Sequence, residues 1–274
     1  MIKKFSSLIR LFVPPFIFLI LKLPFKRRTN FFSGHFYSWS ESIKNIKDGY
    51  ESQVTFQNVV SASLDVKSGK ALYERDGVCF YEEEFRWPVI SSILNAKNLS
   101  RSTSFNVLDF GGSLGSFYNQ HIKFLSQIDN LKWNIIEQKK LVEIGKDKFQ
   151  NSILRFYESI SEYKINNKSN LILLSSSIQY LEDPFKILEE LIQLNPQFFI
   201  IDRTPFTKKN YDFVMHQNLP KIMGGQVYPA WFFSQKKFFQ FFEKNNYFMH
   251  SNFNCEEDYG VGRFQGIVFQ RKRK

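Results

Sequence analysis

The chain has 274 residues, of which 43% are hydrophobic and 23% are charged. This composition supports a large packed core and excludes a disordered, collagen-like or linker-rich protein. Two cysteines argue against a disulfide framework and against a zinc site built from two or four thiolates. The four histidines show no HxxxH or HxH spacing, so the sequence does not favour a metalloenzyme.

The net charge of +11 is concentrated at the two ends of the chain. Residues 1–28 hold seven basic side chains and no acidic one, and the last four residues are all basic. The remaining 242 residues balance 26 basic against 26 acidic side chains. A neutral body argues against a phosphate-tracking groove, so we expect no nucleic-acid partner. Basic ends suit an anionic surface such as a membrane leaflet.

The basic segment 1–28 contains an apolar run, LFVPPFIFLIL, at residues 11–21. A helix of this length spans about 16 Å against about 30 Å of hydrocarbon, and two prolines interrupt it, so a transmembrane helix is excluded. No small-residue cleavage site follows, which argues against a signal peptide. Two hypotheses stay open: an interfacial anchor on anionic lipid, or a helix packed on the domain. Both hypotheses predict a cytoplasmic protein, and under the first one the protein would be attached peripherally to the inner membrane.

Residues 29–100 predict a helical extension. The capping box SWSE at 38–41 predicts a first helix, which ends at the glycine of SIKNIKDGY. A second helix is expected from near Ser52 to before Gly69, and a third over residues 85–96. The charged and aromatic stretch 73–85 between the last two predicts a loop. We expect the extension to act as a lid, with Arg75 and Asp76 as its polar residues.

From residue 105 onward, short apolar runs alternate with helical stretches, which is typical of βαβ units and a parallel sheet. The expected strands lie at 105–110, 133–137, 153–157, 170–176, 198–202, 247–253 and 264–270. The expected helices lie near 116–126, 138–149, 184–194 and 235–244. The sequence therefore predicts an α/β, Rossmann-like domain over 101–274, with an insertion at 203–232.

The most specific local signal is the turn after the first of these strands, VLDFGGSLGSF at 107–117. Gly111, Gly112 and Gly115 let the backbone approach a ligand closely, and the start of the next helix offers free N–H groups. Doubly wound folds bind ligands at this carboxyl edge. The next strand ends in Glu137, and a carboxylate there typically accepts hydrogen bonds from ribose hydroxyls. Together these features predict an adenosine-containing cofactor.

Three details favour S-adenosylmethionine over NAD. The pattern that starts at Asp109 is Asp-x-Gly-Gly-Ser-x-Gly and not GxGxxG. A carboxylate at Asp109 would repel a pyrophosphate but suits the amino-acid end of S-adenosylmethionine. About 100 residues precede the strand, whereas many dinucleotide domains begin with theirs.

Over roughly residues 34–270, the chain resembles a family of bacterial S-adenosylmethionine-dependent methyltransferases encountered in surface-polysaccharide gene clusters. The resemblance is carried by the strings LDFGGSLGSFY, WNIIEQ, LLSSSIQYLEDP, IIDRTPF and YPAWFF. It implies a class I methyltransferase fold, with a mostly parallel seven-stranded sheet and one antiparallel strand near its edge. It also implies methyl transfer to a small molecule or saccharide.

The resemblance further implies which residues hold S-adenosylmethionine. It places Glu137 at the ribose, Glu158 at the adenine and Ser176 at the sulfonium. Around the methionine part it places the residues of the turn: Asp109, Gly111, Gly112, Ser113 and Gly115. Ser113 stands where the general class I pattern has its middle glycine. This departure keeps open the alternative of a non-catalytic nucleotide- or S-adenosylmethionine-binding protein. An NAD-dependent oxidoreductase is a third hypothesis.

Candidates for the reacting end follow the fourth and fifth strands of the expected sheet. Arg203 would clamp a carboxylate or phosphate of the acceptor, while Asp202 is either a general base or the ion-pair partner of Arg203. Tyr180 would contact the acceptor or close over the cofactor, or would cap a helix start. His216, in the insertion, is either a base or a bystander.

Two aromatic residues of the insertion have two interpretations. Tyr228 and Trp231 would stack on a sugar or nucleotide ring, or they belong to the core.

Overall fold

The computed structural model describes residues 31–44, 46, 53–219, 225–255 and 261–272. The chain divides into a unit of residues 1–31 and a unit of residues 32–274, and the fold below is that of the second unit. The segment 1–28 and the two hypotheses about it lie outside the described residues. Within the described part of the chain, no helix is long and apolar enough to cross a bilayer.

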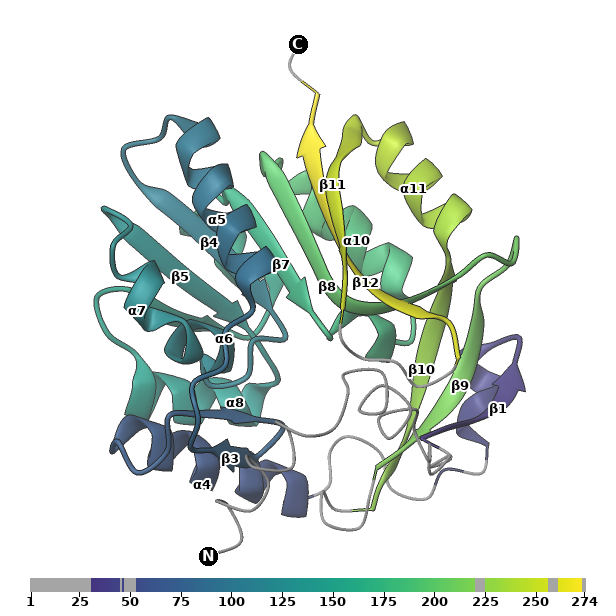
Figure 1. The fold of residues 1–274 in the computed structure, drawn as a ribbon, viewed down its shortest axis with the longest axis horizontal. Helices are drawn as coiled ribbons and strands as arrows, with labels where there is room; N and C mark the ends of the chain where they lie inside the picture. Colours follow the sequence, from purple (N-terminus) through teal and green to yellow (C-terminus); the bar gives the residue numbers. More distant parts are fainter. Residues whose placement is uncertain (1–30, 45, 47–52, 220–224, 256–260, 273–274) are drawn as a thin grey trace, which may run out of the picture. The chain divides into compact units, whose positions relative to one another are not determined.

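A mostly parallel sheet forms the centre of the unit (Figure 1). Its main strands are β4 (Phe105–Phe110), β5 (Leu131–Ile136), β6 (Leu154–Tyr157), β7 (Leu171–Ser175), β8 (Phe198–Thr207), β11 (Tyr247–Asn254) and β12 (Arg263–Arg271). They lie in the order β6-β5-β4-β7-β8-β12-β11. The first five are parallel, and β12 is antiparallel to both β8 and β11. The predicted α/β class is confirmed, and β12 is the antiparallel strand that the resemblance implied.

Helices cover both faces of this sheet (Figure 1). One face carries α5 (Trp87–Ser100), α6 (Ser116–Gln120), α7 (Ile122–Leu125) and α8 (Lys139–Ile144), which continues as a π-helical turn at Gly145–Phe149. The other face carries α9 (Ile160–Asn166), α10 (Pro184–Gln193) and α11 (Gln235–Lys244). Successive strand residues point to opposite faces, so Val107 packs in the first apolar cluster and Leu108 in the second. The central strands β4, β7 and β8 are buried on both sides, which explains their continuous apolar runs, whereas most of β11 is exposed.

The sheet continues beyond β8 into a second group of strands. β8 runs on to Thr207, past the predicted end at residue 202, and its last residues pair in parallel with β10 (Val227–Ser234). β10 pairs with β9 (Phe213–Asn218), which pairs with β1 (Phe32–Phe36). Much of the stretch 203–232, predicted as an insertion, is therefore strand.

The N-terminal extension is less helical than predicted. It contains α3 (Trp39–Ile43), whose first turn is capped by Ser38 Oγ, and then α4 (Gln53–Lys67) and α5. The predicted loop at 73–85 is wrong, because this stretch contains a hairpin of β2 (Tyr73–Arg75) and β3 (Val78–Phe80). Its turn is Asp76-Gly77, with φ of 53° and 77°. Asp-Gly with both residues left-handed is a strong hairpin signal, and Tyr73 stacks on Phe80 at 4.6 Å across the pair.

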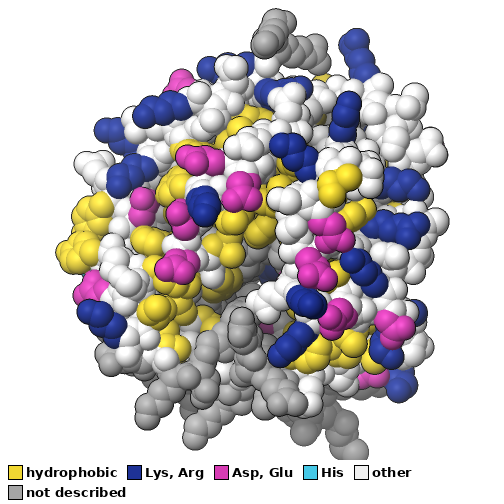
Figure 2. Space-filling view, turned by 180° about the vertical axis from the view of Figure 1, so that it is seen from behind, with side chains coloured by type: hydrophobic (Ala, Val, Ile, Leu, Met, Phe, Trp, Pro, Cys, Tyr) yellow, Lys and Arg dark blue, Asp and Glu magenta, His cyan; other side chains and the backbone are white. Residues whose placement is uncertain are grey.

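Charged side chains of both signs are intermixed on the face shown in Figure 2. Exposed ion pairs in the described part of the chain include Lys146 with Glu162 at 3.2 Å and Lys123 with Glu83 at 3.5 Å. The equal numbers of basic and acidic side chains in the body of the chain thus include ion pairs at its surface. Such exposed pairs contribute little to stability.

A substitution at Phe242 of α11 tests the packing of the second apolar cluster. Its fully buried ring stacks on Phe269 of β12 at 3.9 Å. Phe242→Ala should lower the free energy of unfolding by about 3–5 kcal/mol, measured by urea denaturation, because it removes a large side chain from a closed core. Phe248→Ala is the control, since Phe248 is 41% exposed, and should change it by less than about 0.5 kcal/mol. Equal losses in the two variants would contradict this packing.

Candidate functional site

The glycine-rich turn after β4 is folded tightly against the end of β7. Gly111 and Gly115 have φ of 75° and 92°, a region in which other residues are strained. A Cβ atom at Gly111 would lie 2.7 Å from the Cβ of Ser177, and one at Gly112 would lie 2.5 Å from the carboxyl group of Asp109. These two positions therefore require glycine because the backbone is in close contact with its neighbours.

Ser113 fits the turn although the general pattern has glycine there. It adopts the left-handed region with φ of 53°, and its N–H donates to Oε1 of Glu137 at 3.1 Å. The other carboxylate oxygen of Glu137 accepts from the N–H of Gln138 at 2.8 Å. Burial raises the pKa of Glu137, and the two N–H donors oppose that rise. A carboxylate offers about four lone-pair sites, so Glu137 retains acceptor capacity for a ligand.

Asp109 supports the turn from within the protein. It is 1% exposed, and its Oδ2 accepts from Nε1 of Trp133 on β5 at 3.0 Å. Burial raises the pKa of Asp109 to about 7, the charge of Glu137 adds to the rise, and the Trp133 donor and Arg203 oppose it. Near neutral pH this carboxyl group is therefore protonated in part of the molecules.

The segment after β7 brings several polar side chains to the same edge. The N–H of Ser176 donates to the carbonyl of Asp202 at 2.9 Å, and its hydroxyl accepts from Nε2 of Gln179 at 3.1 Å. Tyr180 donates to Oε1 of Gln217 at 2.6 Å, and burial raises the pKa of Tyr180 to about 12.

Two buried polar atoms of this segment lack a hydrogen-bond partner among the described residues: Oγ of Ser177 and Oε1 of Gln179. Each such atom costs about 1–3 kcal/mol when nothing satisfies it. Ser177 also forms the wall against which Gly111 packs.

A β-bulge lies in β8 at Asp202 and Arg203. Ile267 and Gln265 of β12 oppose Ile201 and Thr204, so three steps along β8 face two along β12. Arg203 has φ of 49°, which costs about 1–2 kcal/mol for a residue with a side chain. In a regular strand, neighbouring side chains point to opposite faces, whereas the bulge lets Asp202 and Arg203 interact. Bulges often re-aim side chains in this way beside active sites.

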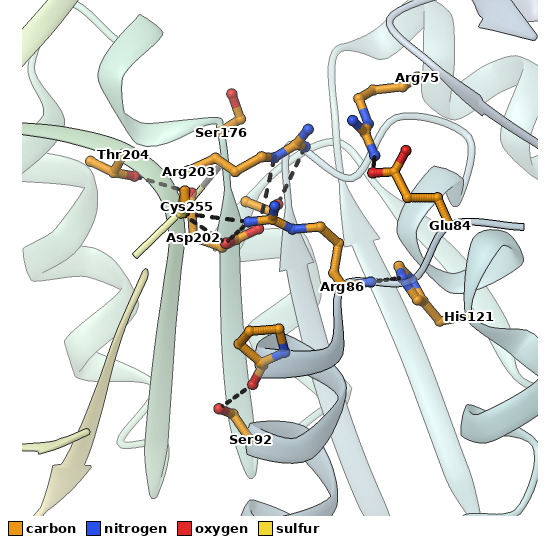
Figure 3. A network of polar contacts seen from close by, with 12 residues as sticks. Arg75, Glu84, Arg86, Ser92, His121, Ser176, Asp202, Arg203, Thr204 and Cys255 are labelled. Atoms are coloured by element: carbon orange, nitrogen blue, oxygen red, sulfur yellow. Dashed lines mark hydrogen bonds and ion pairs between the residues drawn. The ribbon is translucent and has the colours of Figure 1, made fainter. Parts of the chain in front are cut away.

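The carboxylate of Asp202 is the centre of a polar network (Figure 3). It is fully buried, and its Oδ1 accepts from a terminal nitrogen of Arg86 at 2.6 Å. Its Oδ2 accepts from the hydroxyl of Ser175 at 2.9 Å and lies 3.7 Å from Nε of Arg203. The thiol of Cys255 donates to Oδ1 at 3.7 Å, and burial raises the pKa of Cys255 to about 12. Of the two hypotheses for Asp202, the structure describes the ion pair.

Arg86 and His121 belong to this network and were missed in the sequence. The N–H of Arg86 donates to Nε2 of His121 at 3.0 Å, and Nδ1 of His121 lies 2.7 Å from the carbonyl of Phe117. Because Nε2 accepts, we infer that Nδ1 carries the proton and donates to Phe117. Burial lowers the pKa of His121 to about 4, so the ring is neutral at physiological pH. His121 thereby fixes the start of α5 and the position of Arg86.

The hairpin of the extension contacts the helix that follows the glycine turn. Glu74 of β2 is 4% exposed and accepts hydrogen bonds from the hydroxyl of Ser116 and, at 3.2 Å, from the N–H of Gly77. Burial raises the pKa of Glu74. Arg75 pairs with Glu84 at 3.0 Å. The extension therefore contacts the site at Ser116 and, through Arg86, at His121 and Asp202.

Four candidates lie outside this cluster. Glu158 is exposed after β6, and its backbone N–H donates to Oε2 of Glu162 at 2.6 Å. On β9, Nε2 of His216 donates to the carbonyl of Ser42 at 2.7 Å and its ring packs on Phe36. On β10, Tyr228 is 4% exposed.

The fourth, Trp231, also lies on β10. Its Nε1 donates to the carbonyl of Leu181 at 3.0 Å, and its ring packs against the second apolar cluster. Of the two interpretations of the aromatic residues, the structure therefore describes packing for Tyr228 and Trp231.

The described residues contain no group of three or more His, Cys, Asp or Glu side chains placed to hold a metal ion. The polar side chains around Asp202 are instead two arginines, which pair with its carboxylate, and the hydroxyl of Ser175, which donates to it.

Comparisons with known proteins identify similar folds. No family model and no curated protein matches the chain. Among solved structures, the chain is similar to CalS10, an amino pentose methyltransferase from Micromonospora echinaspora solved with S-adenosylmethionine bound. The identity is 9%, the TM-score is 0.47, and the match covers 68% of this chain and 91% of that one.

Two other structures give comparable values. Magnesium protoporphyrin IX methyltransferase from Synechocystis, also with bound S-adenosylmethionine, is 10% identical with a TM-score of 0.47, covering 78% of this chain and 97% of that one. An S-adenosylmethionine-dependent methyltransferase from Clostridium acetobutylicum is 12% identical with a TM-score of 0.45, covering 69% and 93%. At these values the cofactor and the substrate have to be inferred from the side chains of the site.

His121 should make stability depend on pH. Its pKa is about 4 in the folded protein, below its ordinary value of 6.5, so between these values the unfolded chain binds a proton that the folded protein does not. Stability should therefore fall by up to about 3 kcal/mol as the pH falls from 6.5 to 4. His121→Gln should reduce this slope in urea denaturation, whereas His250→Gln, at an exposed position, should keep it. The same slope in all three proteins would contradict a buried neutral His121.

Proposed function

We propose that the protein is an S-adenosylmethionine-dependent methyltransferase that acts on a small molecule or a saccharide. The observation that carries the proposal is the hydrogen bond from the Ser113 N–H to Glu137. It joins the ends of β4 and β5 into one cradle, at the edge where open α/β sheets bind ligands.

The residues of the cradle suit this cofactor. The turn at Gly111 and Gly112, which packs closely on Ser177 and Asp109, would lie beside the methionine part. Asp109 and Ser113 would complete that wall together with Gly115. The free acceptor sites of Glu137 would bind the ribose hydroxyls. Ser176 would flank the sulfonium, with the unsatisfied atoms of Ser177 and Gln179 beside it. Glu158, at the end of β6, would contact the adenine.

S-adenosylmethionine, when bound, supplies an electrophilic methyl group. The role of the protein is to align the acceptor with this methyl group. Both oxygens of Asp202 are engaged, the Tyr180 hydroxyl donates to Gln217, and His216 bonds to the extension. We therefore propose that Asp202, Arg203 and Tyr180 position the acceptor. For His216 we propose a structural role, in which it holds the extension through its hydrogen bond to Ser42.

We further propose that the extension, residues 29–100, forms the lid of the site. The support is two of its contacts, Glu74 with Ser116 beside the cofactor turn and Arg86 with Asp202. A saccharide acceptor under this lid would fit a role in surface-polysaccharide biosynthesis.

Glu137→Gln tests the cradle. The substitution removes a charged acceptor, which is worth about 1.5–3 kcal/mol, so the affinity for S-adenosylhomocysteine should fall by about 10- to 100-fold in a calorimetric titration. Glu143→Gln, which alters an exposed carboxylate on α8, should bind as the wild type does. If Glu137→Gln binds S-adenosylhomocysteine as tightly as Glu143→Gln, the proposed cofactor site is wrong.

A further inference from the structure

We propose that the acceptor carries an anionic group, a carboxylate or a phosphate, and that Arg86 and Arg203 bind it together while Asp202 positions both arginines. This inference rests on the proposed function and names the class of its substrate. It adds Arg86, from the extension, to the substrate site.

Two guanidinium groups converge on one carboxylate. Arg86 approaches Asp202 from the start of α5 and Arg203 approaches it from the bulge of β8, so elements 116 residues apart meet there (Figure 3). The side chains of Arg86 and Arg203 are 13% and 20% exposed, whereas that of Asp202 is 0% exposed. The Cys255 thiol beside them keeps its proton, because burial and Asp202 raise its pKa to about 12. The cluster therefore has an excess of one positive charge.

Arg203 retains donors for a ligand. Its hydrogen bond among the described residues is from one terminal nitrogen to Ser175 at 3.4 Å. Its Nε lies 3.7 Å from Asp202 and has no hydrogen-bond partner in the described part of the chain. The other terminal nitrogen points away from Asp202 (Figure 3). A guanidinium has five N–H groups and binds a carboxylate or phosphate through two of them at once.

The backbone at Arg203 supports the same conclusion. A bulge with φ of 49° would be relaxed with glycine, yet the residue is an arginine. Strain of this kind persists at binding sites, where the position of a side chain matters more than a relaxed backbone. Ser175, the last residue of β7, is the register partner of Asp202 on β8, so the bulge places Arg203 beside the carboxyl end of β7.

The arrangement separates a region of carboxyl groups from the region of the two arginines. Asp109 and Glu137 lie at the ends of β4 and β5, on the side proposed for the positively charged cofactor. β7 separates β4 from β8, so Arg203 is two strand spacings, about 10 Å, from the glycine turn. An anion at the arginines would therefore belong to the acceptor and would lie beside the cofactor without competing with it.

The experiment measures anion binding directly. Inorganic phosphate and acetate are titrated separately, at constant ionic strength, into protein saturated with S-adenosylhomocysteine and into protein without it. The variants are Arg203→Gly, which relaxes the bulge, and Arg203→Gln and Arg86→Lys. Arg271→Gln is the control, because Arg271 bonds to Asn195 at the opposite end of β8. Thermal unfolding verifies that each variant is folded.

We expect at least one anion to bind the wild type and Arg271→Gln in the presence of S-adenosylhomocysteine. Both Arg203 variants should lose about tenfold or more in affinity for it, Arg86→Lys should weaken it, and all should keep their affinity for S-adenosylhomocysteine. Tighter binding of phosphate or of acetate would show which group the acceptor carries.

Three outcomes are informative in other ways. Anion binding that is absent, or unchanged in folded Arg203→Gly, would overturn the inference. An anion that displaces S-adenosylhomocysteine would also overturn it, because the arginines would then hold the carboxylate of the cofactor. Failure of S-adenosylhomocysteine to bind any of the proteins would refute the proposed function alone, and anion binding lost in Arg203→Gly would still support the arginine site.

Discussion

A fully buried carboxylate, Asp202, is the constraint on which the site depends. An unpaired charge in the interior costs several kcal/mol, so the fold has to bring partners to it. Those partners come from far apart in the sequence: Arg86 starts α5, Ser175 ends β7, and Cys255 follows β11. Meeting this requirement ties the extension and the last strands to the carboxyl end of β7 and the middle of β8. The bulge beside Asp202 then aims Arg203 at the same place.

A second constraint acts two strands away, at the glycine turn. The turn is held from below by the hydrogen bond between Asp109 and Trp133 and from the side by that between Ser113 and Glu137. Close contact at Gly111 leaves no room for a side chain. A turn held in place by its neighbours is already shaped before a ligand arrives, and such preorganisation lowers the cost of binding.

The strands and the glycine turn could be predicted because their causes are local. Strands buried on both faces read as apolar runs, and the glycines at 111 and 115 satisfy a backbone requirement at their own positions. The hairpin at Asp76-Gly77 was missed although its signal is in the sequence. The bulge of β8 could not be predicted, because an arginine holds the position that glycine would normally mark.

The partners of Asp202 could not be predicted for a different reason. Arg86 is 116 residues from Asp202 in the sequence, and no spacing rule connects the two. His121 lies between α6 and α7 with no motif around it, and its role appears only when Arg86 is placed beside it. His216 was a candidate by elimination, but the strand β9 carries it to a contact with Ser42.

The central claim is that the ends of β4 and β5 form a site for S-adenosylmethionine. The most direct measurement is a calorimetric titration of the wild-type protein with S-adenosylhomocysteine, with NAD as the comparison ligand. The account predicts binding of S-adenosylhomocysteine with a dissociation constant in the micromolar range and no binding of NAD. Binding of NAD alone, or of neither ligand, would contradict it.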